Sequence, residues 1–333
     1  MKFLKCFGIV SLGLIVALAL LAGGVYLWAA ASTGTSPVAR GIMWGDADVD
    51  DWQRFPSRTI EASSEPVGFE ASTPEWLVDL KIDDKSLATY LEETNTTAFI
   101  VLHGDDLLYE GYFNGSSRES TQTSLSVAKS FASTLVGIAI KEGYIASLED
   151  PVTVYIPELL ERDPRFGDIT IRHLITMASG IQYRETSSPL HDGTKTYYAP
   201  DLRDTAMRSK IEEPPGTRFL YNNYNPLLIG MVLERATNMS VSEYLETRLW
   251  QPMGAEADAS WSLDSEQSGF EKMESGINGR AIDFAKLGWL FLNNGRNGSE
   301  QVVPAAWVEE STRVDTTTDP AAHYQYFWWV DQE

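Results

Sequence analysis

Residues 126–140 read SVAKSFASTLVGIAI, the most apolar stretch of the chain outside its amino-terminal segment. Apart from small residues, nearly every side of a helix with this sequence is apolar, which predicts a helix that begins at Ser124, is buried in the core and is ended by Gly143. Lys129 is the only charged residue in the stretch. Because a buried ammonium without partners is energetically expensive, Lys129 must either have partners or lose its proton.

Ser126 lies three residues before Lys129, and this spacing places two helical side chains on one face, within reach of each other. The pair therefore offers a nucleophile beside an amine. Burial and the positive end of the helix both lower the pKa of Lys129, so that a neutral amine can accept the seryl proton. A structural interpretation stays open, in which Ser126 caps the helix and Lys129 extends to solvent.

A second polar element, YNN at residues 221–223, follows the turn formed by PPG at 214–216. Taken alone it is explained as a turn, since Asn tolerates turn geometry and Tyr packs well. Beside a Ser-Lys pair it gains a chemical interpretation. The Tyr221 phenol can pass the proton from the serine to the leaving group, and the Asn223 amide can hold a substrate carbonyl.

The remaining pattern predicts an antiparallel sheet with helices packed on it. We expect a hairpin over 97–113, a helix over 171–177 capped by Thr170, a helix beginning at Asn225 and Pro226, a helix over 281–292 and a strand over 324–330. Three tyrosines, Tyr183, Tyr197 and Tyr198, either line a pocket, pack in the core or lie in a surface loop.

These motifs make the chain resemble the serine β-lactamase and penicillin-binding-protein-like hydrolases, in the branch of class C β-lactamases, esterases and 6-aminohexanoate-dimer hydrolases. The resembling stretches are SVAKS (126–130), DPVTVYIPEL (150–159), ITIRHLITMASGI (169–181), PPGTRFLYNN (214–223) and VVPAAWV (302–308). Y-x-N in place of S-D-N places the chain on the class C-like side. The resemblance implies an α+β fold of the β-lactamase/transpeptidase type, with an antiparallel sheet flanked by helices and a helical subdomain.

The same resemblance implies roles for four residues. Ser126 would be the acylated nucleophile, Lys129 its base, Tyr221 the general acid/base partner and Asn223 a substrate-orienting amide. The family's third motif, a K-T-G or H-x-G triplet on a strand, does not occur before Glu333, and KTY at 195–197 lacks its glycine. We therefore expect a serine hydrolase domain over 76–333 that lacks its C-terminal strands.

Composition limits which partners, metals and cofactors the protein is expected to bind. The chain has 26 Lys and Arg against 47 Asp and Glu, a formal net charge of -21, which repels phosphate backbones and excludes nucleic acid as an expected partner. One cysteine, Cys6, permits no intrachain disulfide and no cysteine metal cluster. The four histidines show no ligand spacing. No metal and no cofactor are expected.

The amino terminus predicts contact with a membrane. Residues 7–31 are uncharged, and about 20 apolar residues suffice to span a bilayer as a helix. Lys2 and Lys5 precede this segment, whereas many acidic residues follow it, so the positive-inside rule keeps the amino terminus in the cytoplasm. We expect residues 1–31 to be an uncleaved transmembrane anchor, or alternatively a signal peptide cleaved near 29–31. Residues 32–75 are expected to be a linker and irregular lead-in.

Together these patterns predict a membrane-anchored, extracytoplasmic serine hydrolase, periplasmic or extracellular, that forms an acyl-enzyme on Ser126. Its substrate would be a small ester, amide or lactam, which all share the same first step. The alternative is a non-catalytic receptor of the same fold that binds peptidoglycan or a β-lactam. The intact Ser126, Lys129 and Tyr221 argue against that alternative, because a binding protein need not keep a buried lysine.

Overall fold

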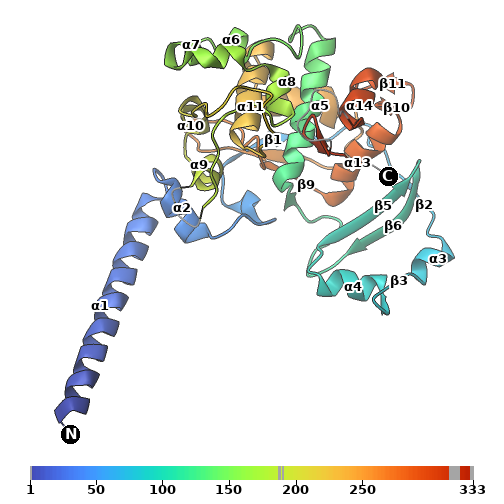
Figure 1. Cartoon of the computed structure of the whole chain (residues 1–333). Coiled ribbons are helices and arrows are strands. Elements are labelled where there is room, and N and C mark those ends of the chain that lie inside the picture. The colour runs from blue at the N-terminus through green and yellow to red at the C-terminus, as the bar shows by residue number, and fades with distance from the viewer. Residues whose placement is uncertain (1, 187–188, 190, 315–322, 331–333) are drawn as a thin grey trace.

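The computed structural model describes residues 2–186, 189, 191–314 and 323–330, with side chains for residue 14 and for those from 16 onward. A four-stranded sheet in the order β1-β8-β9-β7 has only antiparallel neighbours. Its strands are β1 (Ser57–Ile60), β7 (Gln122–Thr123), β8 (Ala259–Ser262) and β9 (Ile277–Gly279). Helices pack around this sheet (Figure 1), so the predicted α+β class is confirmed.

The predicted hairpin is also confirmed, and it belongs to a separate sheet. Strand β5 (Ala98–His103) pairs antiparallel with β6 (Asp106–Tyr112), and β6 pairs in parallel with the short β2 (Glu70–Ala71). Gly104 at φ +58 makes the tight turn between the two long strands, a backbone conformation that glycine adopts without steric cost. Figure 1 shows this hairpin at one side of the molecule, above helix α4 (Leu87–Glu93).

Helix α5 (Ala128–Lys141) lies at the centre of the core and packs against α11 (Tyr224–Thr237). Most side chains of both helices are buried, as the apolar sequence around residue 130 predicts. Gly143, at φ +80, follows the carboxyl end of α5, which confirms the predicted stop. Residues 124–127, which we expected to be the first turn of this helix, instead form a separate 3₁₀ turn, η2 (Leu125–Val127).

The other elements are mostly short. They are α3 (Glu75–Val78), β3 (Lys81–Ile82), β4 (Lys85–Ser86), α6 (Val152–Tyr155), α7 (Glu158–Arg162), η3 (Pro164–Asp168), α8 (Ile171–Ile175), α9 (Asp192–Tyr198), α10 (Leu202–Met207), α12 (Val241–Leu245), η4 (Glu246–Trp250), α13 (Ala281–Leu292), β10 (Arg296–Asn297), β11 (Glu300–Gln301) and α14 (Ala305–Thr312).

Two predicted helix boundaries are confirmed and one is wrong. The Thr170 hydroxyl accepts from the backbone N–H of His173 at the start of α8, and α13 spans 281–292 as expected. Helix α11 begins at Tyr224, not at Pro226. The Asn222 side chain accepts from the N–H of Tyr224 at 2.9 Å and so satisfies the first turn two residues earlier than predicted.

Residues 32–75 contribute regular structure to the body of the molecule. They include α2 (Pro37–Trp44), η1 (Asp51–Gln53) and strand β1, which pairs with β8 from Ser57 opposite Ser262 to Ile60 opposite Ala259. The expected linker thus carries an edge strand of the central sheet. Strand β1 was not predicted because four residues are too few to show the alternating pattern of a strand, and because its pairing partner lies far along the chain.

The predicted strand over 324–330 is wrong. The segment folds back on itself as β12 (Tyr324–Gln325) and β13 (Trp328–Trp329), which pair antiparallel. Tyr326 and Phe327 adopt φ values of +40 and +64, so the backbone turns between the two strands. Both turn side chains are buried, and this burial offsets the cost of an uncommon backbone conformation.

The first helix, α1 (Lys2–Ser32), projects away from the rest of the molecule (Figure 1). In the part of the chain that the structure describes, no single helix is both long and apolar enough to cross a membrane. Residues 16–32 of α1 meet that requirement only together with α2, across a bend of 115°.

Candidate active site

Ser126 stands on an exposed turn between the central sheet and the buried helix. It lies in η2, directly after β7 and before α5, and its side chain is exposed to solvent. The backbone N–H of Ser124 donates to the carbonyl of Ile277 at 2.7 Å and fixes this turn to β9. Leu125 adopts a φ of +47, a strained conformation for a branched side chain immediately before the serine.

Lys129 lies below Ser126 and is 1% exposed. Its Nζ donates to Ser126 Oγ at 3.2 Å and to the backbone carbonyl of Glu274 at 2.8 Å. The lysine therefore does not extend to solvent, and no serine side chain caps the amino end of α5. Both structural interpretations of the Ser-Lys pair are thus wrong, and the predicted proximity of the two side chains is confirmed.

The surroundings of Lys129 increase the fraction of its side chain that is a neutral amine. Burial lowers the pKa of Lys129 to about 8, and the negative charge of Glu274 opposes this decrease. At neutral pH roughly a tenth of such amines lack the extra proton, compared with fewer than one in a thousand at an ordinary lysine. A lysine of this kind can accept a proton from a serine hydroxyl.

Tyr221 completes a group of three side chains. The Nζ atom of Lys129 lies 5.0 Å from the centroid of the Tyr221 ring. Burial raises the pKa of Tyr221, a hydrogen bond with Ser126 opposes that rise, and the carboxylate of Glu185 adds to it. Trp329 stacks on the Tyr221 ring with centroids 5.8 Å apart and fixes its orientation. The phenol therefore keeps its proton at neutral pH and is positioned to donate it.

Asn223 occupies the N-cap position of α11 and takes part in a different contact from the one we expected. Its Nδ2 donates to the Tyr183 hydroxyl at 3.1 Å, while its Oδ1 is buried and has no hydrogen-bond partner among the described residues. The Asn223 Nδ2 group, which we expected to donate to a substrate carbonyl, therefore donates to the hydroxyl of Tyr183 instead. Asn223 lies two residues from Tyr221, and the proposed role in substrate orientation stays a prediction.

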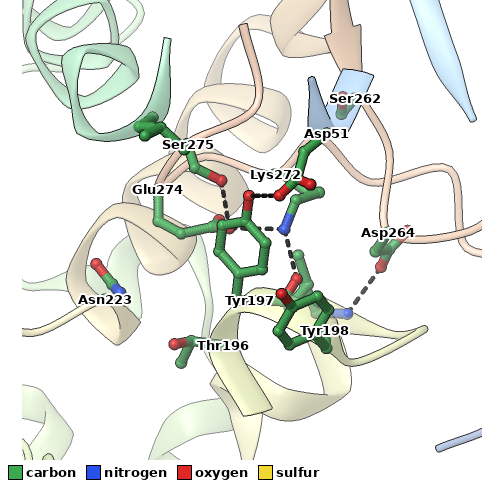
Figure 2. Close-up of polar contacts among 12 residues, drawn as sticks. Asp51, Thr196, Tyr197, Tyr198, Asn223, Ser262, Asp264, Lys272, Glu274 and Ser275 are labelled. Atoms are coloured by element: carbon green, nitrogen blue, oxygen red, sulfur yellow. Dashed lines mark hydrogen bonds and ion pairs between the residues drawn. The ribbon is translucent and has the colours of Figure 1, made fainter. Parts of the chain in front are cut away.

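The three tyrosines considered as pocket residues separate into two groups. Tyr183 contacts Asn223 and belongs to the surroundings of the site. Tyr197 donates its hydroxyl to Asp51, and Tyr198 donates its hydroxyl to the carbonyl of Gly45, so both bind the segment before β1. Figure 2 shows Tyr197 beside Asp51 and Lys272.

Sequence reasoning missed Lys272 and Glu274, which adjoin the site from the loop before β9. Each is 1% exposed, and the Glu274 carbonyl is the second acceptor for Lys129. The stretch FEKMES (270–275) looks like an ordinary polar surface, with alternating acid and base. No signal in that pattern distinguishes a buried ion pair from an exposed one. Among the described residues no group of three or more His, Cys, Asp or Glu side chains is arranged to hold a metal ion.

Comparison with known proteins identifies the family. A sequence model of the Beta-lactamase family matches residues 85–333, about three quarters of the chain. The chain belongs to the beta-lactamase family. It is 29% identical over 334 residues to a 6-aminohexanoate-dimer hydrolase of Paenarthrobacter ureafaciens, a match that covers 90% of this chain and 84% of the relative. It is 32% identical over 128 residues to a Beta-lactamase of Escherichia coli K12, covering 38% of this chain and 32% of the relative.

Solved structures agree with this family fold. A Bacillus anthracis protein assigned to the 6-aminohexanoate-dimer hydrolases superposes with a TM-score of 0.75 at 23% identity, covering 89% of this chain and 82% of that protein. A family VIII carboxylesterase gives a TM-score of 0.54 at 18% identity, with coverages of 74% and 77%. The family and its named hydrolases support a serine hydrolase, and the expected β-lactamase-like fold is confirmed.

Proposed function

We propose that the protein hydrolyses a small linear ester or amide through an acyl-enzyme formed on Ser126. One observation carries this proposal. The exposed Ser126 hydroxyl lies 3.2 Å from the amine of Lys129, which is buried and has a pKa lowered to about 8. A neutral amine in that position can remove the hydroxyl proton as the serine attacks.

The reaction would proceed in two halves. In acylation, Ser126 Oγ attacks the substrate carbonyl carbon and Lys129 Nζ accepts the hydroxyl proton, while the Tyr221 hydroxyl donates a proton to the leaving alcohol or amine. The ammonium of Lys129, whose Nζ lies 5.0 Å from the centroid of the Tyr221 ring, then returns its proton to the Tyr221 phenolate, which restores both groups. In deacylation, water attacks the ester on Ser126 and its proton passes to the same pair. The acid product leaves and the serine is regenerated.

The comparisons favour a linear ester or amide over a β-lactam. The relative named for an amide dimer matches 90% of this chain, whereas the relative named Beta-lactamase matches 38% of it. A ring-strained lactam would nevertheless share the first acylation step.

A fluorophosphonate probe tests this proposal, because it labels a serine only when that serine is activated. We expect the protein to be labelled and the Ser126→Ala variant to be unlabelled. Ser130→Ala is the matched control, since Ser130 lies one turn further along and its hydroxyl donates to the carbonyl of Phe327. Labelling that persists in Ser126→Ala would show that the nucleophile lies elsewhere. A wild-type protein that resists labelling would favour the non-catalytic receptor.

We also propose that α1 anchors the protein, with the hydrolase domain on the extracytoplasmic side. Two observations support this location. Residues 7–31 carry no charge, and Leu20 and Leu27 are 72% and 70% exposed on a helix that projects from the body (Figure 1). The test is alkaline carbonate extraction of cell membranes containing the full chain or residues 32–333. The full chain is expected in the membrane pellet, and its recovery in the supernatant would refute the anchor.

A further inference from the structure

A buried ion pair adjoins the candidate base through the backbone of Glu274. Lys272 Nζ lies 2.9 Å from Glu274 Oε1, and each residue is 1% exposed (Figure 2). Taking two charges out of water costs enough that replacement by apolar residues is often neutral or stabilising. Packing alone therefore gives no reason for this pair.

Glu274 contacts Lys129 through its backbone and acts on it through its charge. Its carbonyl accepts from Lys129 Nζ at 2.8 Å, and its carboxylate is the charged group that opposes the loss of the Lys129 proton. Oε1 accepts from Lys272 and from the Ser275 hydroxyl at 2.8 Å. Oε2 is buried and has no hydrogen-bond partner among the described residues. One residue thus determines both the place and the electrostatic surroundings of the amine.

Lys272 is held from several sides, which keeps its charge next to Glu274. Its Nζ donates to the Tyr197 carbonyl and lies 3.8 Å from the centroid of the Tyr197 ring and 4.4 Å from that of Phe55. The Tyr197 hydroxyl donates to Asp51, which is itself 1% exposed. The segment before β1 therefore completes the enclosure of the ion pair.

We propose that Glu274 is a positioning residue for Lys129 and that Lys272 is its counter-ion, which prevents the carboxylate from holding Lys129 as a permanent ammonium. This inference rests on the proposed role of Lys129 as base. With Lys272 present, the buried pair is neutral overall and Lys129 can lose its proton. Without Lys272, the negative charge of Glu274 would be balanced most directly by Lys129.

The other charged and titratable groups that face these three residues come from different elements. They are Asp51 of η1, Arg40 of α2 and Tyr197 of α9 beside Lys272 and Glu274, and Tyr221 beside Lys129. Burial is the largest influence on the pKa of Lys272 and lowers it; the charge and hydrogen bond of Glu274 and the charge of Asp51 oppose that decrease, and Arg40 adds to it. A single substitution in the Glu274–Lys272 pair is therefore the change that most alters the net charge beside Lys129.

Two substitutions are expected to shift the pH dependence in opposite directions. Glu274→Gln removes the negative charge, so Lys129 loses its proton more easily. The acidic limb, which is the pH range over which the labelling rate rises as Lys129 loses its proton, therefore moves to lower pH. Lys272→Met leaves the carboxylate unbalanced, so the limb moves to higher pH. A unit charge a few ångströms away shifts a partly buried group by about one pH unit or more. The readout is the fluorophosphonate labelling rate from pH 5 to 10.

The double variant Lys272→Met/Glu274→Gln keeps the pair neutral, and its limb is expected close to the wild-type position. If Lys272→Met alone does not fold, the double variant is compared with Glu274→Gln instead, and its limb is expected at higher pH than that of Glu274→Gln. Lys286→Met is the matched control, because Lys286 is 0% exposed and its amine is paired with Asp283 and Glu256 instead of with Glu274. We expect it to change thermal stability without moving the limb.

The inference is overturned if the acidic limb moves in the same direction in both single variants, or if it moves in neither. The proposed function is unaffected by that outcome as long as the wild type is labelled at Ser126. Absence of labelling in the wild type would instead refute the proposed function itself. The two failures are therefore distinguishable in one series.

Discussion

The amine of Lys129 lies 5.0 Å from the ring centroid of Tyr221, and both side chains reach the hydroxyl of Ser126. A ring face attracts the charged form of the amine, whereas burial favours its neutral form. Burial is the larger effect here, since the pKa of Lys129 is lowered to about 8. A single serine oxygen thus has a weak base on one side and a proton donor on the other.

The first prediction concerns pH. We expect kcat/KM for p-nitrophenyl acetate to rise with pH through about 8, because the neutral form of Lys129 is the active base and the ammonium predominates below its pKa. Lys129→Arg keeps the positive charge and cannot act as a base, so it should lose about 10²- to 10⁴-fold in kcat/KM. An unchanged acidic limb in Lys129→Arg would assign the titration to another group.

The second prediction separates the acid role of Tyr221 from its packing. Tyr221→Phe keeps the ring on Trp329 and removes only the hydroxyl. Hydrolysis of a p-nitroanilide should fall about 10²- to 10⁴-fold, since the amine leaving group needs a proton. Hydrolysis of the p-nitrophenyl ester should fall less, because p-nitrophenolate leaves without one. Equal losses on both substrates would contradict a role in leaving-group protonation.

The third prediction concerns the substrate class. The purified protein should hydrolyse short-chain p-nitrophenyl esters with a higher kcat/KM than a chromogenic cephalosporin. An activated ester needs little help from the leaving-group acid. A higher kcat/KM for the cephalosporin would reverse the assignment in favour of a β-lactamase.

The fourth prediction concerns packing. A Cβ atom on Gly137 of α5 would lie 2.3 Å from the ring of Trp307 in α14. Gly137→Ala should therefore destabilise the protein by about 1–3 kcal/mol, because the helices must separate. Gly288→Ala in α13 is the control, since its Cβ meets no atom within 4 Å and helix propensity should stabilise it by about 1 kcal/mol. Urea unfolding of both variants checks the difference in sign.

The features that the sequence predicted correctly are those that depend on residues close together in the chain. Ser126 and Lys129 are three residues apart, so their contact follows from the helical path, even though η2 precedes α5. Helix α13 was predicted to the residue because its apolar periodicity and its terminal Asn and Gly agree. The predicted strand over 324–330 failed for the opposite reason, since the turn at Tyr326 is stabilised by burial in the core and not by turn residues.

The contacts that the sequence did not predict join distant segments. Glu274 contacts Lys129, and Lys272 pairs with Glu274, from a loop about 140 residues later, and nothing in their neighbours marks them as buried. Asn223 was predicted near the site, but its bond to Tyr183 depends on how α11 meets the loop after α8. Side-chain partners across such distances are set by the packing of whole elements, which a single sequence does not show.

Strand β1 occupies an edge position of the central sheet and is held by β8, a partner far along the chain. Ser57 pairs with Ser262, about 200 residues further along the chain, and loop closure over that length precedes any gain from the pairing. The segment before β1 also donates from Trp52 N–H to the Thr123 hydroxyl at 2.9 Å, directly ahead of the nucleophile turn. The turn that carries Ser126 is therefore held by two segments that lie far from it in the chain, one before it and one after it, and its geometry depends on both having folded against it.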